Sequence, residues 1–214
     1  MLSAALGVAS RHELRLGSRV RAQRRVPIDG HWPIKIAGVG RYAPQRVVPS
    51  AEVEALCHIP AGTSLLNSGV ARRHWADLER GETATHMGTR AAREALDDAG
   101  LSPSELDLII NASATPHQAI PDGACLIQRE LGLQDSGIRC LSVHSTCLSF
   151  VSALEVAAAF IATGRHRHIL IVSVDLASSG LNFEEAESAT LFGDLAAAAV
   201  IVPTPAGEAS ALHR

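Results

Sequence analysis

The chain has 214 residues, of which 47 % are apolar and 19 % are charged, and its formal net charge is −3. This length is enough for one sizeable core or two small domains, and the composition is typical of a soluble globular protein. The apolar runs are far shorter than the ~20 residues of a membrane-spanning helix. The small net charge gives no reason to expect a nucleic-acid or acidic-lipid partner.

The first 33 residues differ from the rest in charge. They carry six arginines against Glu13 and Asp29, whereas the remainder carries 13 basic and 20 acidic residues. Their apolar stretch precedes the basic one, which is the wrong order for a secretory signal. A transit peptide and a misread start codon remain alternatives. We expect a disordered extension over 1–33, one domain over 34–203 and a polar tail over 204–214.

From residue 34 onward, periodicity predicts strands that alternate with helices. Residues 83–99 repeat apolar side chains at three-to-four spacing and end at Gly100, as an amphipathic helix does. Residues 57–69 are rich in Pro, Gly, Ser and Asn and predict a loop. The predicted strands are 34–40, 106–112, 138–143, 168–174 and 196–202, and the predicted helices are 50–56, 83–99, 121–131 and 148–163. This order predicts an α/β fold with a mixed, mostly parallel five-stranded sheet and helices on both faces.

Cys147 falls between a predicted strand and a predicted buried helix. At the N-terminus of a helix, the free N–H groups and the helix dipole favour an anion, so a cysteine there tends to have a lowered pKa. The same N–H groups can stabilise the oxyanion formed when a thioester carbonyl is attacked. Because a free cysteine is also often a small buried hydrophobe, local pattern alone leaves both roles open.

The other cysteines form no CxxC pair and no metal-ligand spacing, so we expect no metal and no disulfide scaffold. Cys125 and Cys140 fall inside a predicted helix and a predicted strand, which favours structural roles, and Cys57 stays undecided. His144, three residues before Cys147, is interpreted as a loop histidine. This cysteine usage indicates a reducing, cytoplasmic setting.

Five stretches stand in order along residues 34–202. They are Ile36-Ala-Gly-Val-Gly40 with Tyr42-Ala-Pro44, Ser68-Gly-Val70 with Arg73, Ile120-Pro-Asp-Gly-Ala-Cys-Leu-Ile-Gln128 with Leu131-Gly132, Thr146-Cys147-Leu-Ser-Phe150, and Leu191-Phe-Gly-Asp194. In order and spacing they resemble the β-ketoacyl-acyl-carrier-protein synthase III family of the thiolase superfamily. The resemblance implies a thiolase-like half-fold in which Cys147 is the catalytic nucleophile. It also implies acyl transfer to Cys147 and a decarboxylative Claisen condensation with a malonyl thioester, in fatty-acid or polyketide-type biosynthesis.

The resemblance covers only the first of the two halves of that fold. The catalytic His and Asn of the second half have no match here, so we expect acyl transfer but no condensation by this chain alone. The alternative is an inactive fragment, or an interaction subunit that needs a separate C-terminal half. Acyl carrier protein is the expected partner, together with a homodimer or a heteromer with a chain that carries the missing half. No cofactor beyond the thioester substrates is expected.

The resemblance also marks departures from the family. Its coenzyme A trio, an aromatic residue and two arginines, falls on Thr63, Asn67 and Ala186, which predicts weak coenzyme A binding and a carrier-protein thioester as donor. Ile120 and Phe192 are the expected substrate-binding residues; Ile120 matches a position that reaches into the acyl pocket of the family's dimer partner. After Phe192-Gly-Asp194, two family glycines are replaced by Leu195 and Ala197, which predicts a distorted turn or a relaxed constraint.

Overall fold

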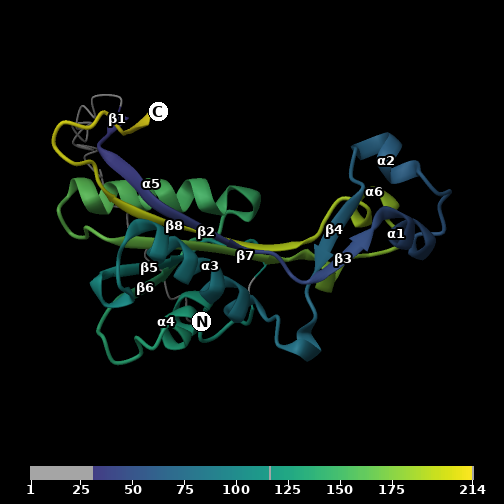
Figure 1. Cartoon of the computed structure of the whole chain (residues 1–214), viewed down its shortest axis with the longest axis horizontal. Helices are drawn as coiled ribbons and strands as arrows, with labels where there is room; N and C mark the ends of the chain where they lie inside the picture. The colour runs from purple at the N-terminus through teal and green to yellow at the C-terminus, as the bar shows by residue number, and fades with distance from the viewer. Residues whose placement is uncertain (1–30, 116, 214) are drawn as a thin grey trace, which may run out of the picture.

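Figure 1 shows a sheet with helices on both faces that ends on one side in a small lobe. This computed structural model describes residues 31–115 and 117–213, so residues 1–30 of the extension expected over 1–33 lie outside the described residues. The strands of the main sheet are β2 (Ile34–Tyr42), β5 (Leu108–Asn111), β6 (Arg139–Ser142), β7 (Ile169–Leu176) and β8 (Asp194–Pro203). The helices packed on it are α3 (Ala84–Ala99), α4 (Gly123–Glu130) and α5 (Ser149–Ala162). Each of these eight elements overlaps one that the periodicity predicts.

The strand order in this sheet is β2-β8-β7-β5-β6. β5 is parallel to β6 and β7, whereas β8 is antiparallel to both β7 and β2. Four of the five strands therefore point the same way, which confirms a mixed, mostly parallel sheet. β8 is the exception because the chain turns back through the lobe at the carboxyl end of β7, so the next strand returns in the opposite direction.

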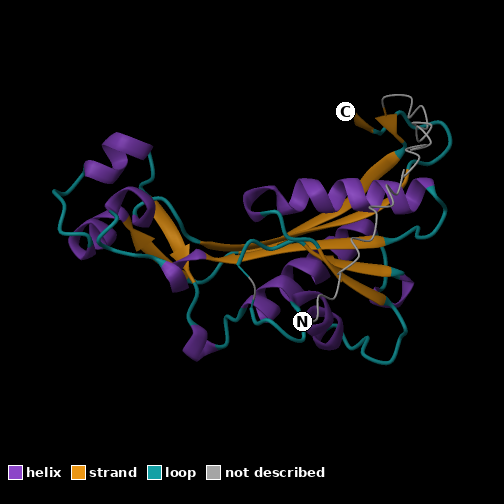
Figure 2. Cartoon of the chain, turned by 180° about the vertical axis from the view of Figure 1, so that it is seen from behind, coloured by secondary structure: helices purple, strands orange, loops and turns teal. Residues whose placement is uncertain are grey.

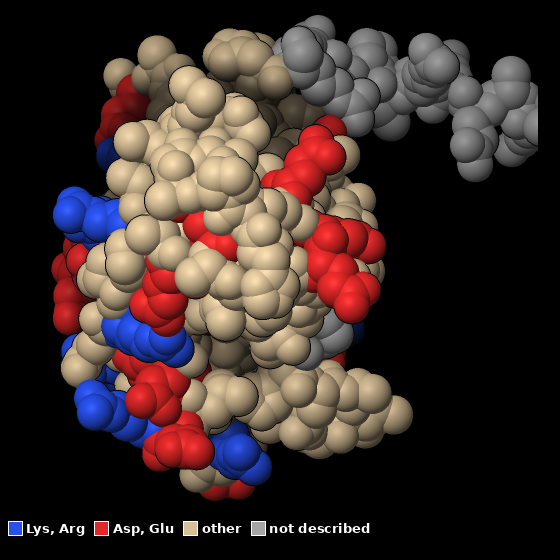
Figure 3. Space-filling view, turned by 90° about the vertical axis from the view of Figure 1, so that its right-hand side faces the viewer, with Lys and Arg blue, Asp and Glu red and all other residues tan. Residues whose placement is uncertain are grey.

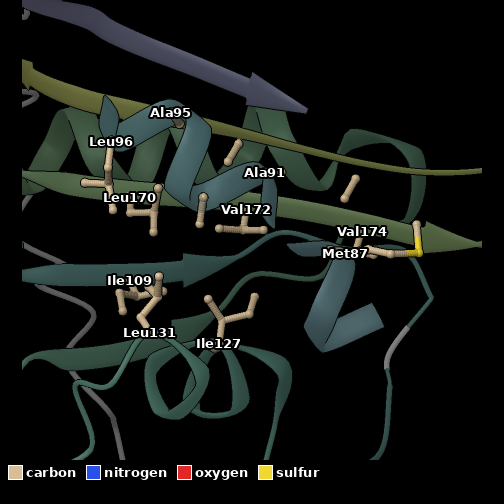
Figure 4. Packing of buried hydrophobic residues seen from close by; sticks show 14 of the residues in the cluster. Met87, Ala91, Ala95, Leu96, Ile109, Ile127, Leu131, Leu170, Val172 and Val174 are labelled. Carbon is tan, nitrogen blue, oxygen red and sulfur yellow. The ribbon is translucent and has the colours of Figure 1, made fainter. Parts of the chain in front are cut away.

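α3 and α4 cover one face of the sheet and build its larger core. Figure 4 shows side chains of the two helices packed against those of β5 and β7. The fully buried members include Met87, Ala91, Ala95, Ile109, Leu170 and Val172. α4 begins at Gly123 with Asp122 as its N-cap, which accepts the Ala124 N–H at 3.1 Å. The helix predicted from residue 121 therefore starts two residues later, because Asp122 provides the side-chain cap.

β2 carries glycine where α3 crosses it. A Cβ atom at Gly38 would lie 2.3 Å from the Ala95 carbonyl oxygen, and one at Gly40 would lie 2.2 Å from the Ala91 carbonyl oxygen. Such distances are impossible for real side chains, so the helix reaches this close only because the strand presents bare backbone. Val39 points to the opposite face and is 56 % exposed.

α5 lies alone on the opposite face of the sheet (Figures 1 and 2). Its small residues Ala153, Ala157 and Ala158 are fully buried and allow the helix to pack closely on β7 and β8. The rest of α5 is also mostly apolar, with Glu155 its one charged residue, yet Val151 is 55 % exposed. This second core is therefore closed towards the sheet and open on the outer side of the helix.

The lobe consists of the hairpin β3 (Arg46–Pro49) and β4 (Arg72–Trp75) with α1 (Ser50–Leu56), α2 (Thr63–Ser68) and α6 (Ala186–Ala189). Its small core contains Val48, Val53 and Trp75. The prediction of a loop through residue 69 is wrong for α2, and the sequence did not predict the hairpin. Both depend on packing with residues far along the chain: the Arg73 side chain donates to the Thr190 carbonyl at 2.5 Å.

Short elements complete the fold. β1 (His31–Trp32) pairs antiparallel with β9 (Leu212–His213), and Trp32 and Leu212 pack against the α5 core. These strands lie just outside the 34–203 boundaries drawn from sequence. The 3₁₀ turns are η1 (Leu78–Arg80), η2 (Pro103–Glu105), η3 (Thr146–Leu148) and η4 (Ala177–Gly180). Within the described ranges, no helix is both long and apolar enough to cross a membrane.

Candidate active site

Cys147 lies in the turn between β6 and α5. β6 ends at Ser142, Cys147 is the middle residue of η3, and α5 begins at Ser149. The turn follows the carboxyl end of β6, and sites in parallel sheets lie at this end of the strands. Cys147 is an exposed, free cysteine, so a reagent can reach its thiol without any opening of the core.

Ser149 holds this turn together. Its hydroxyl donates to the Thr146 carbonyl at 2.7 Å and accepts the Ser145 N–H at 2.9 Å. The side chain is buried, with 2 % of its surface exposed. A single buried hydroxyl thus binds the backbone of the two residues that precede Cys147.

Thr146 is in the left-handed region of the backbone, with φ of 52°. A β-branched residue is an outlier there, and such a conformation costs about 1–3 kcal/mol. The hydrogen bond from Ser149 to the Thr146 carbonyl offsets part of this cost. Strained residues cluster at functional sites, so the position of this one beside Cys147 supports a functional role for the turn.

The N-terminus of α5 follows Cys147 directly. Among the described residues, no side chain caps it. The Ser149 N–H already donates to the Thr146 carbonyl, whereas the positive end of the helix dipole favours an anion next to the thiol.

A polar network braces the carboxyl ends of β5 and β7 behind the turn. The Ser113 hydroxyl donates to Asn111 Oδ1 at 2.7 Å and accepts the Val174 N–H at 2.9 Å. One Asp175 carboxylate oxygen accepts the Ala114 N–H at 2.8 Å. His144 belongs to the same region, with its Nδ1 atom 3.3 Å from the Ser113 carbonyl oxygen. The network joins β5, β7 and the segment that leads to Cys147.

The Phe192-Gly193-Asp194 segment joins the lobe to the sheet. The carboxylate of buried Asp194 accepts the Ala76 N–H at 2.7 Å and the Ser178 N–H at 2.8 Å. A Cβ atom at Gly193 would lie 2.9 Å from the His74 carbonyl oxygen, so glycine is required there. Phe192 is 50 % exposed at this junction. No contact among the described residues tests its predicted role in substrate binding, so that role stays a prediction.

The two positions where the family has glycine lie in regular structure. Leu195 pairs with Asp175 and Ala197 with Ser173, both in extended β8. Neither has a positive φ. The distortion expected from these replacements is therefore wrong, because the strand backbone suits any residue. Leu195 is 47 % exposed and adds an apolar side chain to the surface.

Thr63, Asn67 and Ala186 line one groove of about 580 Å³ between α2 and α6. Of the residues that line it, Glu187 is the one with a charge. The full lining is Ile59, Thr63, Ser64, Asn67, Ser68, Ala186, Glu187, Thr190 and Leu191. Figure 3 faces this end of the molecule and shows a mostly uncharged centre, with Lys and Arg towards one side. A groove of this composition offers no cation to a phosphate.

Glu54 supports the floor of this groove from below. Its carboxylate accepts the Ser64 N–H at 2.7 Å and the Gly62 N–H at 2.9 Å. These two bonds hold the pKa of Glu54 below its ordinary value, and the bond from the Ser64 N–H contributes most. Glu54 is buried, and its lowered pKa keeps the carboxylate that anchors α2 ionised.

Ile120 lies in the loop before α4, and 88 % of its surface is exposed. Its peptide bond to Pro121 is cis, and the Gln118 side-chain amide donates to the Ile120 carbonyl at 3.0 Å. The loop thus presents a large apolar side chain to its surroundings. Such exposure fits a contact with a second chain, which remains a prediction here.

A search of the described residues finds no group of three or more His, Cys, Asp or Glu side chains able to hold a metal ion. The exposed cysteine, the strained turn and the uncapped helix are the chemical features of this end of the sheet. Together with the two layers of helices they describe an α/β domain with an accessible thiol at a strand-to-helix turn.

The comparisons with known proteins agree with this class. The family described as 3-Oxoacyl-[acyl-carrier-protein (ACP)] synthase III matches residues 141–213. The β-ketoacyl-[acyl-carrier-protein] synthase III of Bordetella petrii is 40 % identical over 171 residues, which cover 78 % of this chain and 51 % of that protein. The chain is similar to the β-ketoacyl-acyl-carrier-protein synthase III family, and it spans about half the length of the curated relatives it matches.

Solved structures give the same result. The 3-oxoacyl-[acyl-carrier-protein] synthase III of Aquifex aeolicus superposes with a TM-score of 0.75 at 34 % identity, over 82 % of this chain and 55 % of that one. The priming β-ketosynthase of the R1128 polyketide biosynthetic pathway gives 0.74 at 30 % identity, over 81 % and 51 %. The predicted thiolase-like fold is therefore confirmed.

Sequence reasoning located Cys147 but missed the residues that support it. Ser149 acts through hydrogen bonds to backbone groups and Thr146 through its φ angle, while Asp194 ties the lobe to the sheet. A serine two residues after a candidate nucleophile is a weak signal, because serine is common at helix starts. The bond from the Ala76 N–H to Asp194 joins residues 118 positions apart, which periodicity does not detect.

Proposed function

We propose that this chain takes up an acyl group on Cys147, as the first half-reaction of a β-ketoacyl-acyl-carrier-protein synthase III. The single observation that carries the proposal is the exposed cysteine in a strained turn directly before the uncapped N-terminus of α5. The similarity to the named relatives supports it, because they are synthases of this kind.

In this proposal the Cys147 sulfur attacks the thioester carbonyl carbon. The carbonyl oxygen becomes an oxyanion, which first-turn N–H groups of α5 stabilise. Collapse of the intermediate expels the donor thiolate and leaves an acyl-cysteine. The buried Ser149 and the hydrogen bonds it makes keep the thiol and these N–H groups in one geometry. Condensation with a malonyl thioester would then need groups supplied by a further polypeptide segment.

We further propose that the donor is a carrier-protein thioester. The groove between α2 and α6 supports this, because it offers Glu187 and neutral side chains where a nucleotide phosphate would need cations. Replacing Asn67 and Ala186 with arginine should supply the cations that a nucleotide phosphate needs. Charge-assisted hydrogen bonds contribute about 1.5–3 kcal/mol each, so Asn67→Arg with Ala186→Arg should speed acylation by coenzyme A esters by roughly tenfold or more. Unchanged rates would contradict this use of the groove.

The test is intact-mass spectrometry of the purified chain after incubation with acyl-carrier-protein and coenzyme A thioesters. We expect one acyl adduct, faster from the carrier-protein donor, and none in Cys147→Ala. Cys125→Ala removes another exposed thiol and is the matched control that should keep the adduct. An adduct that persists in Cys147→Ala would refute the proposed nucleophile, and faster acylation by coenzyme A esters would refute the proposed donor.

A second candidate function is an interaction subunit, and the open side of α5 favours it. An apolar groove of about 480 Å³ runs along this helix and is lined by Trp32, Val151, Val156 and Leu212 among others. A helix that is apolar nearly all round is normally buried. A homodimer, or a heteromer with a chain that carries the remaining half, would cover it. In this role the chain would act in the cytoplasm without a cofactor.

Size-exclusion chromatography with light scattering separates the two candidates. An enzyme half that works alone should be a well-behaved monomer that still forms the adduct. An interaction subunit should self-associate, and it should form the adduct only after a chain that supplies the other half is added.

A further inference from the structure

Cys125 and Cys140 lie on two elements that pack against each other. Cys125 is exposed on α4, and Cys140 is half-buried on β6, at the edge of the sheet. Cys140 packs against the core on the α3–α4 side of the sheet. The Gln128 side-chain amide of α4 donates to the Ile138 carbonyl, just before β6, at 2.7 Å.

This hydrogen bond sets the register between α4 and β6. α4 connects the parallel strands β5 and β6, so it runs opposite to both. One turn back from Gln128, about 4.5 Å along the helix, lies Cys125. Two residues forward from Ile138, about 6.6 Å along the strand, lies Cys140. Both steps go in the same direction, so the two residues lie at a similar level along the sheet, and the Cys125 thiol is near enough to Cys140 to affect its pKa.

The surroundings of the two thiols differ. Burial and, to a smaller extent, the neighbouring Cys125 thiol raise the pKa of Cys140 to about 12. Cys140 is therefore a neutral thiol at neutral pH. Cys125 is exposed to solutes. Since no group of three metal-ligating side chains was found among the described residues, a bond between the two sulfurs is the simpler use of the pair.

We propose that Cys125 and Cys140 form a reversible dithiol–disulfide pair, separate from Cys147, that a small-molecule disulfide such as oxidised glutathione oxidises. The Cys125 thiolate attacks one sulfur of the oxidant, which forms a mixed disulfide and releases one thiolate. Cys140 then loses its proton and attacks the Cys125 sulfur, which releases the second thiolate. Two electrons pass to the oxidant, which leaves as two thiols once it has taken up the two cysteine protons.

The order of attack follows from exposure. The thiolate is the nucleophile, and access controls which cysteine meets the oxidant, so Cys125 reacts first and Cys140 resolves. The bridge would close a loop between residues fifteen positions apart and join α4 to the strand that leads into the Cys147 turn. For a loop of this length, we expect the melting temperature to rise by roughly 5–10 °C.

The test is peptide mapping of the reduced full-length chain after incubation with oxidised glutathione, an acid quench and alkylation under denaturing conditions. Trypsin cuts after Arg139 and next after Arg165, so Cys140 and Cys147 share one peptide. Fragmentation of that peptide, and a repeat in Cys147→Ala, separate them. We expect a Cys125–Cys140 cross-link in both proteins and the higher melting temperature that accompanies it.

Two variants test the order of events. Cys140→Ser should stop at a stable mixed disulfide on Cys125, and Cys125→Ser should leave Cys140 alkylated and the melting temperature unchanged. A lasting mixed disulfide on Cys125 in the unmutated chain, a bond from Cys125 to Cys57 or Cys147, or a bridge between two chains would overturn the proposal. The mapping of the unmutated chain decides the question even if a variant does not fold.

Discussion

The two faces of the sheet differ in how completely they are covered. On the α3–α4 face, α3 packs against the bare glycine backbone of β2 at Gly38 and Gly40. On the α5 face, one apolar helix covers part of the sheet, and Val39, Val151 and Leu195 are each about half exposed. Close packing tolerates no added atom, whereas exposed apolar surface tolerates many changes.

Cys147 belongs to the open face, at the start of α5. The difference between the faces therefore separates the tightly packed part of the domain from the part to which we assign acyl transfer and contacts. The predictions that follow test this separation.

The largest loss of stability is expected on the α3–α4 face, where α3 packs directly on β2. Gly40→Ala adds a Cβ atom that would lie 2.2 Å from the Ala91 carbonyl oxygen and 2.4 Å from the Ala95 nitrogen, both of them backbone atoms. Because backbone cannot move aside cheaply, the free energy of unfolding should fall by about 2–3 kcal/mol. Urea denaturation measures this. Gly180→Ala is the matched control, since its Cβ atom would meet nothing within 4 Å and should leave stability unchanged or slightly raised. Equal losses of stability at the two glycines would show that α3 does not pack on β2 more tightly than surface segments pack on their neighbours.

An intermediate effect is expected at the turn that joins the two faces. Ser149→Ala removes the hydroxyl that binds the Thr146 carbonyl and the Ser145 N–H. We expect a loss of about 1–3 kcal/mol in stability, because two buried polar groups lose their partner. We also expect a fall of roughly tenfold or more in the acylation rate of Cys147, measured by stopped incubation and intact mass.

Ser152→Ala, one turn away on the same helix, is the control for Ser149→Ala and should change neither quantity. A Ser149→Ala protein that loses stability but acylates at the normal rate would show that the turn is structural only.

The smallest effect is expected on the open face. Val151→Asp replaces an exposed apolar side chain in the first turn of α5, where a negative charge suits the helix dipole. The free energy of unfolding should change by no more than about 0.5 kcal/mol. Ala153→Asp is the matched variant: Ala153 is fully buried against the sheet, so a charge there should cost clearly more stability than Val151→Asp does. A large loss in Val151→Asp would mean that this side of α5 is already covered, for example by a second copy of the chain.

Much of the fold could be predicted from the sequence because it follows from local periodicity. The buried strands β5 and β7 are continuous apolar runs, and α3 repeats its small residues at helical spacing. The position of Cys147 could be predicted for the same reason, since a strand, a turn and a helix are adjacent in the chain, whereas its role as a nucleophile came from the resemblance. The hairpin β3–β4 and the helix α2 could not, because short polar segments are defined by contacts such as Arg73 to Thr190.

The sequence by itself determined the order of the elements, the α/β class and the position of Cys147 between β6 and α5. The tertiary structure alone decided that the groove between α2 and α6 has Glu187 as its one charged residue, that Cys125 and Cys140 lie on packed neighbouring elements, and that α5 is open on one side. The physical reason is the range of the interactions. Hydrophobic periodicity and capping act between residues a few positions apart, whereas grooves, thiol pairs and exposed faces arise from segments that only the folded backbone brings together.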